Sequence, residues 1–299
     1  MQSSVLTAVV LPVALGVIML GLGLSLTWAD FRRVAQMPRA VLIGLGVQVL
    51  VLPAVAFGLC HLFDLAPVLA VGFVLLAASP GGATANLFSH LADGDVALNI
   101  TLTATNSLLS IFTLPLLVGL GLAHFLGQDR HIDLQLGKVL SVILVVVGPV
   151  AIGMAVRKKR PELAARLDRP VRAASAVFLF LVIAATVYSE RHRLGELFAQ
   201  VGLPALVFNL ASLGVGFGVP RLLRLPERQA TAIALEIGIH NGTLAIAVAH
   251  NVLQDATMAV PAAIYSLIMF ATAGLFTAWA RQRLRAGPTL AEGGARAGG

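Results

Sequence analysis

Long runs of apolar residues follow one another along nearly the whole chain and are separated by short polar segments. A run of about 20 apolar residues is long enough to cross the hydrocarbon core of a bilayer as a helix. The pattern predicts about nine such helices, at 5–27, 40–61, 66–91, 96–123, 136–156, 173–188, 197–219, 230–252 and 257–280. We therefore expect one transmembrane domain over residues 1–280, followed at 281–299 by a disordered tail rich in Gly and Ala.

The composition agrees with an all-α polytopic membrane protein. Of the 299 residues, 58% are hydrophobic and 12% are charged, and the mean hydropathy is +0.90. Soluble domains do not have this balance, so the lipid bilayer is the expected surrounding. The single cysteine, Cys60, excludes an internal disulfide and a cysteine-built metal site. No aromatic residues alternate with the basic ones, so nucleic acid is not an expected partner.

The distribution of basic residues predicts the orientation in the membrane. If the N-terminus lies outside, 17 of the 21 Lys and Arg residues fall in the inner connections and the tail. Inner segments carry such an excess in most membrane proteins. We therefore expect the N-terminus outside and the C-terminus in the cytoplasm.

Two of the predicted helices are interrupted in the middle. The third reads VGFVLLAASPGGATANLFSHL, in which a proline and two glycines favour unwound backbone. The eighth reads TAIALEIGIHNGTLAIAVAH, in which two glycines bracket a short polar segment. Non-helical backbone at membrane depth occurs only where it is buried in protein or lines a watery cavity.

These two helices predict an inverted repeat. They are five apart in order, so they cross the membrane in opposite directions, and a short turn and one more helix follow each. The first repeat would cover about 1–123 and the second about 134–280. Discontinuous helices at matching positions of inverted repeats are typical of the midplane site of a secondary transporter. The alternative is a pair of unrelated Pro and Gly kinks.

Glu236 is the only acidic residue inside the long apolar runs, and no Lys or Arg lies beside it in the sequence. An acidic side chain at the bilayer centre costs about 2.5 to 3.5 kcal/mol on insertion scales, so it requires a compensating partner. One interpretation is a protonated glutamate, or one that is hydrogen-bonded between helices. The interpretation that we favour is an ion or proton site.

A polar stripe follows one face of the fourth predicted helix. Its members are spaced 4, 3, 4 and 3 residues apart and are Asn99, Thr103, Asn106, Ser110 and Thr113. Hydrogen bonds between helices explain the outer members. The oxygens of Asn106 and Ser110 are the ones that we expect to have a functional role. Together with Asn86 and Glu236 they offer amide, hydroxyl and carboxylate oxygens, which a hard cation prefers.

The segment ASPGGATANLFSHLADGDVALNITLTATNSLLS, followed far downstream by ALEIGIHNGTLAIAVA, resembles the bile acid:sodium symporter family. The resemblance covers nearly the whole chain. It implies a panel of helices packed against a core in which two broken helices cross, with two sodium ions bound behind the crossing. It also implies sodium-coupled symport of an organic anion, either bile-acid-like or a small pantoate-like carboxylate. The expected location is a bacterial inner membrane, and no protein partner is implied.

The resemblance also assigns residues to sites. It implies a first sodium site formed by Asn86, Asn106, Ser110 and Glu236. It implies a second sodium site formed by Gln48, Glu236, His240 and the backbone carbonyls of Ile237 and Ile239. It implies a substrate pocket at the crossing, formed by Gly81, Gly82, Ala83, Thr84 and Asn241.

Two positions depart from the family pattern, since Ala85 stands where serine is usual and His240 where glutamine is usual. An imidazole nitrogen is a poorer ligand for a hard ion than an amide oxygen. Three roles therefore stay open for His240: ion ligand, proton-coupling group or hydrogen-bond partner. Both departures favour the alternative of a proton-coupled or sodium-independent carrier or exporter.

Other function classes are less well supported by the sequence. An intramembrane enzyme is disfavoured because the sequence contains neither an HExxH motif nor a membrane-embedded GxSG motif, and no aspartate pair lies at midplane. A receptor or channel is a further alternative, which a saturable substrate flux would distinguish from a carrier. We therefore expect a transporter and not an enzyme.

Overall fold

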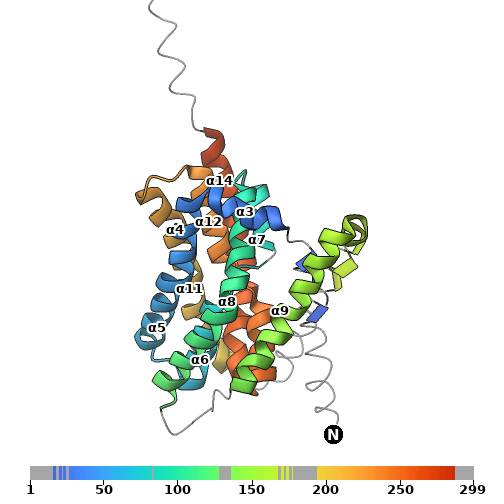
Figure 1. Cartoon of the computed structure of the whole chain (residues 1–299). Helices are drawn as coiled ribbons and strands as arrows, with labels where there is room; N and C mark the ends of the chain where they lie inside the picture. The colour runs from blue at the N-terminus through green and yellow to red at the C-terminus, as the bar shows by residue number, and fades with distance from the viewer. Residues whose placement is uncertain are drawn as a thin grey trace, which may run out of the picture.

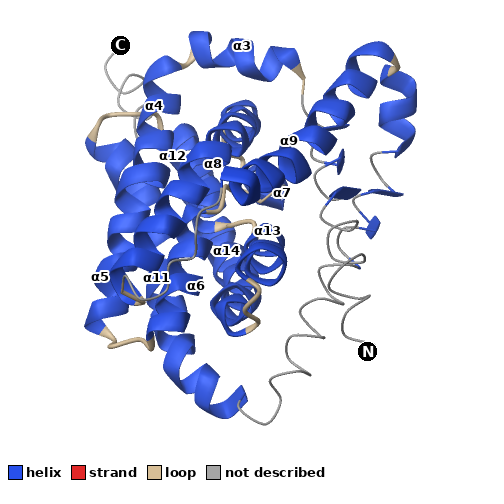
Figure 2. Ribbon diagram, turned by 60° about the horizontal axis from the view of Figure 1, so that its bottom comes forward, coloured by secondary structure: helices blue, strands red, loops and turns tan. Residues whose placement is uncertain are grey.

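The computed structural model describes residues 27–82, 84–127, 136–167 and 194–286, together with isolated positions between 16 and 24 and between 170 and 177. Within these ranges all regular elements are helices (Figures 1 and 2). Four helical stretches there are long and apolar enough to cross a membrane: Pro38–Leu62, Val96–Phe125, Gly195–Leu222 and Thr257–Arg285. The predicted all-α membrane fold is confirmed.

The number of spans stays a prediction. The first and sixth predicted helices, at 5–27 and 173–188, lie mostly outside the described residues. The last helix, α14 (Val260–Ala286), continues six residues past the expected end at 280, so the tail begins later than predicted. The rest of that tail lies outside the described residues.

The second predicted span contains a π-helical turn. It consists of α4 (Pro38–Gly46), the turn η2 (Val47–Val51) and α5 (Leu52–Leu62). Single π-helical turns inside α-helices are frequent at functional sites. Here the turn contains Gln48, one of the predicted ligands.

The two interrupted helices are present and cross at their breaks. The first is α6 (Pro67–Ala78) followed by α7 (Thr84–Leu91), and the second is α12 (Glu227–Gly238) followed by α13 (Gly242–Val248) and the π-helical turn η3 (Ala249–Leu253). The backbones of the breaks pair with each other in an antiparallel bridge. This pairing satisfies peptide groups that the interrupted helices leave without partners.

The bridge between the breaks is short and well defined. The Gly82 N–H donates to the Ile239 carbonyl at 2.7 Å, and the Asn241 N–H donates to the Pro80 carbonyl at 2.8 Å. Two long helices, α8 (Val96–Phe125) and α11 (Leu194–Leu222), flank the crossing: α8 packs on α6 and α12, and α11 packs on α12 and α14. The crossing is therefore enclosed by helices.

Side chains around the crossing form a dense core. Phe73 on α6, Phe208 on α11 and Tyr265 on α14 are completely buried. The Phe208 ring contacts the other two, with its centroid 5.3 Å from that of Phe73 and 5.8 Å from that of Tyr265. In α11, a Cβ atom at Gly216 would lie 2.8 Å from the Ala234 Cα atom, so the backbones of α11 and α12 approach closely there. Helix α9 (Leu136–Lys159) stands to one side, against α8 (Figure 1). The division into a panel and a core stays a prediction.

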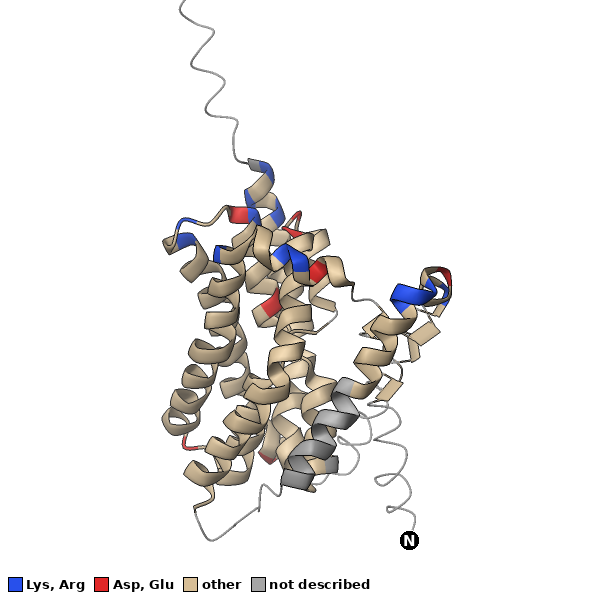
Figure 3. Cartoon of the chain, in the orientation of Figure 1, with Lys and Arg blue, Asp and Glu red and all other residues tan. Residues whose placement is uncertain are grey.

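Lys and Arg residues gather at one end of the core and at the matching end of α9 (Figure 3). At this end the turn between α7 and α8 contacts the end of α14, since Asp93 Oδ2 lies 3.1 Å from Arg285 Nε and 3.6 Å from Arg281 Nε. Arg283 pairs with Glu227 at 2.6 Å. Such exposed pairs contribute little stability individually. These residues belong to the connections and the tail that the charge pattern assigns to the inner side, and they lie together at one end of the molecule.

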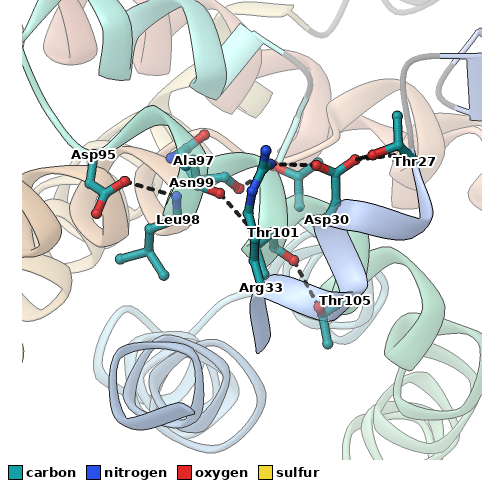
Figure 4. Close-up of polar contacts among 10 residues, drawn as sticks. Thr27, Asp30, Arg33, Asp95, Ala97, Leu98, Asn99, Thr101 and Thr105 are labelled. Carbon is teal, nitrogen blue, oxygen red and sulfur yellow. Dashed lines mark hydrogen bonds and ion pairs between the residues drawn. The ribbon is translucent and has the colours of Figure 1, made fainter. Parts of the chain in front are cut away.

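The start of α8 and the short helix α3 (Trp28–Gln36) lie at the same end (Figure 4). Asp30 accepts hydrogen bonds from the backbone N–H and the hydroxyl of Thr27, both at 2.7 Å, and pairs with Arg33 at 2.6 Å. Asp95 caps α8 by accepting from the Leu98 N–H at 3.0 Å. Side-chain acceptors at these positions satisfy N–H groups at helix starts. The residues next to the starts of α3 and α8 therefore determine where these two helices begin.

Candidate cation site at the crossing of the interrupted helices

Glu236 lies one turn before the break that ends α12, and only 2% of its surface is exposed. Its Oε2 atom accepts a hydrogen bond from the Thr103 hydroxyl at 2.6 Å. Its Oε1 atom has no hydrogen-bond partner among the described residues, and none of the ion pairs in that part of the chain includes Glu236. A buried carboxylate with one free oxygen and no paired cation is costly.

Two side chains of the polar stripe on α8 reach α12. The Asn99 amide donates to the Ala232 carbonyl at 2.7 Å, and Thr103 contacts Glu236 one helical turn later. Helices α8 and α12 therefore run side by side in the same direction. The Asn99 Oδ1 atom is buried and has no hydrogen-bond partner among the described residues. This places a second free oxygen on the helix face that contacts Glu236.

The Thr103 hydroxyl has two acceptors within reach. Its oxygen lies 2.6 Å from Glu236 Oε2 and 3.1 Å from the carbonyl oxygen of Asn99 in its own helix. When the proton points to the Asn99 carbonyl, a lone pair of the hydroxyl oxygen faces the carboxylate. In that orientation both oxygens would be available to one cation, because a hydroxyl both donates and accepts.

The first break touches the carboxylate directly. A Cβ atom at Gly81 would collide with Glu236 Oε1 and with the carboxyl carbon. Only glycine allows this close approach. The free oxygen of Glu236 therefore faces the unwound backbone of the other interrupted helix.

The residues predicted for the first sodium site are not equally close to Glu236. Asn106 is buried, and its Nδ2 atom has no partner among the described residues. If the register of Asn99 and Thr103 continues, Asn106 is level with the break after α12. The Ser110 hydroxyl donates to the Ser107 carbonyl of its own helix at 2.8 Å. Asn86 is half-buried in the first turn of α7.

The sequence analysis assigned Asn99 and Thr103 to hydrogen bonding between helices, and both do bond to α12. It did not predict that Thr103 contacts Glu236. The available signal was their spacing. They are four residues apart, as are Ala232 and Glu236, so two parallel helices bring both pairs together.

Gln48, predicted for the second sodium site, caps the end of α6. It is 4% exposed, and its Nε2 atom donates to the carbonyls of Ala77 at 3.3 Å and Ser79 at 3.1 Å. Its Oε1 atom is buried and has no hydrogen-bond partner among the described residues. Gln48 therefore orders the first break and also presents a free amide oxygen.

Asn209 on α11 has the corresponding role at the other break and was not singled out from the sequence. Its Nδ2 atom donates to the Gly238 carbonyl and to the Tyr265 hydroxyl, both at 2.9 Å. In both repeats the amide lies 29 residues before the carbonyl that it caps. The numbering offset from Gln48 to Asn209 also relates Pro80 to Asn241, so the pairing of the breaks follows the inverted repeat.

His240, in the second break, is 1% exposed and contacts aromatic residues. Its Nδ1 atom lies 3.1 Å from the Tyr265 hydroxyl, and its Nε2 atom has no hydrogen-bond partner among the described residues. Ile237 and Ile239 are buried, and the Ile239 carbonyl already accepts from the Gly82 N–H. The partner of His240 is thus Tyr265, and no hydrogen bond joins His240 to Glu236.

The residues predicted for the substrate pocket lie at the crossing, except that Ala83 is outside the described residues. Gly81 and Gly82 are buried in the paired backbone, whereas Thr84 is exposed at the start of α7. Asn241 Oδ1 accepts from the Leu244 N–H at 3.0 Å and so caps α13. The starts of α7 and α13 both adjoin the crossing.

The donor set around Glu236 suits a singly charged hard cation. It contains one carboxylate, a hydroxyl and amide oxygens, which are the ligands that such ions accept. No group of three or more His, Cys, Asp or Glu side chains that could hold a metal ion occurs within the described ranges. A lone carboxylate balances one positive charge.

Comparison with known proteins gives consistent relatives. The sequence profile described as the Sodium Bile acid symporter family matches residues 12–197. The "Uncharacterized sodium-dependent transporter YocS" of Bacillus subtilis (strain 168) is 30% identical over 256 residues, which cover 85% of this chain and 77% of that protein. The "Ileal sodium/bile acid cotransporter" of Oryctolagus cuniculus is 26% identical over 243 residues, which cover 81% of this chain and 69% of that protein.

A plant relative is longer than this chain. The "Probable sodium/metabolite cotransporter BASS2, chloroplastic" of Oryza sativa subsp. japonica is 27% identical over 262 residues, which cover 88% of this chain and 61% of that protein. The chain therefore spans less than two thirds of the plant protein.

Proposed function

The chain belongs to the Sodium Bile acid symporter family, and we propose that it carries an organic anion together with sodium by alternating access. Membership of this family makes it an integral membrane transporter that depends on sodium, and not an enzyme. The single observation that carries the finer proposal is the buried Glu236 carboxylate, which has a free oxygen against the first break and a hydroxyl partner on α8.

Sodium would bind the free oxygen of Glu236, next to Thr103 and the backbone near Gly81. Asn99, Asn86 and Asn106 are the side chains that would complete this site from α8 and α7. A second ion would take the free oxygen of Gln48, together with the carbonyl of Ile237 and the unpaired nitrogen of His240. The transport cycle would therefore use one or two sodium ions.

The coupling follows from which elements the ion touches. Glu236 belongs to the second interrupted helix and Gly81 to the first, so one cation between them holds both breaks. The cation also cancels the carboxylate charge, which would otherwise repel an anion at the crossing. The starts of α7 and α13 carry partial positive charge from their helix dipoles. The anion would then bind between Thr84 and Asn241, with Gly81, Gly82 and Ala83 beside it.

The membrane potential supplies the driving force. A potential of 100 mV is worth about 2.3 kcal/mol per elementary charge that crosses the membrane. One surplus sodium ion per anion therefore supports roughly 50-fold accumulation, since 1.4 kcal/mol corresponds to a factor of ten. We expect the basic end of the molecule to face the cytoplasm, as the positive-inside rule predicts for a bacterial inner membrane.

The names of the relatives support an organic anion as substrate, since they include a bile acid and a metabolite. A thermal-shift screen of steroid acids and small carboxylates, run in parallel in sodium and in potassium, tests the proposal. We expect a stabilising anion whose effect requires sodium, because a bound ligand stabilises only the state that it binds. Stabilisation of equal size in potassium would refute sodium coupling.

A second experiment addresses the alternative of proton coupling. The specific observation in favour of it is the unpaired Nε2 atom of the buried His240. Uptake into proteoliposomes with an imposed pH gradient and no sodium gradient separates the two mechanisms. Accumulation driven by the pH gradient alone would favour the proton-coupled carrier.

A further inference from the structure

Two histidines meet at the end of the core opposite the Lys- and Arg-rich end. His61 lies in the last turn of α5 and His124 in the last turn of α8. Their Nε2 atoms are 2.7 Å apart, and both side chains are exposed. Neither residue belongs to the candidate cation site. The pair therefore lies outside the machinery proposed for transport.

Aromatic neighbours fix both imidazole rings. The His61 and His124 rings are perpendicular with centroids 4.9 Å apart. Phe57, one turn before His61, makes an edge contact with His124 at 5.6 Å and stacks on Phe125 at 5.4 Å. Phe125 in turn lies 5.3 Å from His61. Phe57 and Phe125 thus hold the two imidazole rings next to each other at this end of the core.

This geometry points to a metal site: we propose that His61 and His124 bind one divalent first-row transition-metal ion through their Nε2 atoms. As neutral rings the pair forms one hydrogen bond, in which one Nε2–H donates to the Nε2 lone pair of the other ring. If both rings carry their protons on Nδ1 instead, both Nε2 lone pairs are available to a metal ion. Neutral imidazole is the commonest protein ligand for such ions.

A shared ion fits after the two exposed rings turn and separate. Metal–nitrogen bonds of about 2.0–2.1 Å place two ligands on one ion roughly 3 Å apart. The rings now lie nearly end to end, since their centroids are 4.9 Å apart with the nitrogens at 2.7 Å, so ion binding requires both rings to turn until their Nε2 atoms point at one ion between them. Water would complete the coordination, because the pair is exposed. Hard ions such as sodium and magnesium prefer oxygen ligands, so the pair selects copper, nickel or zinc.

Binding of Cu2+ to the purified, tag-free full chain in detergent tests the proposal. Electron paramagnetic resonance of the Cu2+ complex should show one ion per chain with hyperfine coupling to two nitrogens. In His61→Gln and His124→Gln the coupling should fall to one nitrogen, and the dissociation constant should rise at least about tenfold. Zn2+ should raise the Tm of the wild-type chain and not of the double variant.

Matched variants separate this site from the other histidines. His90→Gln changes an exposed histidine on α7 and should leave Cu2+ binding unchanged. A variant in which His131 and His192 are both glutamine should also keep the two-nitrogen signal. The proposal is overturned if the His61→Gln/His124→Gln variant, with an unaltered Tm in the absence of metal, binds Cu2+ like the wild type. It is equally overturned if the signal depends on His131 and His192.

Discussion

The hydroxyl of Thr103 is expected to set sodium affinity, and Thr103→Val tests this with almost no change in volume. The substitution removes the donor that lies 2.6 Å from Glu236 Oε2 and also the oxygen offered to the cation. Removing a group at or beside a metal ligand typically lowers metal affinity about 10- to 100-fold. The sodium concentration for half-maximal effect should therefore rise by a similar factor, about 10- to 100-fold.

The assay is sodium-dependent thermal stabilisation and sodium-dependent uptake, with potassium replacing sodium at constant ionic strength. Thr101→Val and Thr105→Val are matched controls in the same helix. Their hydroxyls donate to the carbonyls of Ala97 at 2.8 Å and of Thr101 at 2.7 Å, both within α8 (Figure 4). Both controls should stay within about twofold of the wild type. The reasoning is refuted if Thr103→Val also stays within twofold, or if either control changes as much as Thr103→Val.

Further predictions concern the breaks. Gly81→Ala should abolish sodium-dependent stabilisation, because its Cβ atom would collide with the carboxylate of Glu236. Gly46→Ala is the control and should keep that stabilisation, since the space around its Cβ position is open. Equal sodium responses of the two variants would contradict this prediction. Tyr265→Phe should lower the Tm because it removes a donor to the Gly238 carbonyl and the partner of the His240 ring, at a cost of about 1 kcal/mol. An unchanged Tm, measured in detergent, would show that the hydroxyl is not needed to order the second break.

The helical architecture was predictable because each signal is local. Apolar runs of spanning length, Pro80 with its neighbouring glycines, and Gly238 and Gly242 determine where helices cross the bilayer and where they are interrupted. The two interrupted helices are five apart in the order of predicted helices, an odd number, so they were expected to cross in opposite directions. The observed pairing of Gly81 with His240 agrees with this expectation.

The composition of the site was less predictable, because it depends on the register between helices that are distant in sequence. The polar stripe on α8 could be recognised in the sequence, but its spacing does not determine which turn of α8 faces Glu236. The contacts of Asn99 with Ala232 and of Thr103 with Glu236 set that register, one to two turns before Asn106 and Ser110. Asn209 gave no sign of its role, because a single amide in an apolar helix resembles a packing residue until the repeat relates it to Gln48.

Sodium-driven uptake by the Glu236→Gln variant tests the central claim most directly. The substitution keeps the size of the side chain and removes its charge, so the cation loses the one group that attracts it to the crossing. In proteoliposomes loaded with potassium and placed in sodium, the wild type should accumulate the anion found in the thermal-shift screen. Glu236→Gln, folded as judged by its Tm, should show no accumulation above the level without a sodium gradient. Full sodium-dependent accumulation by this variant would contradict the account.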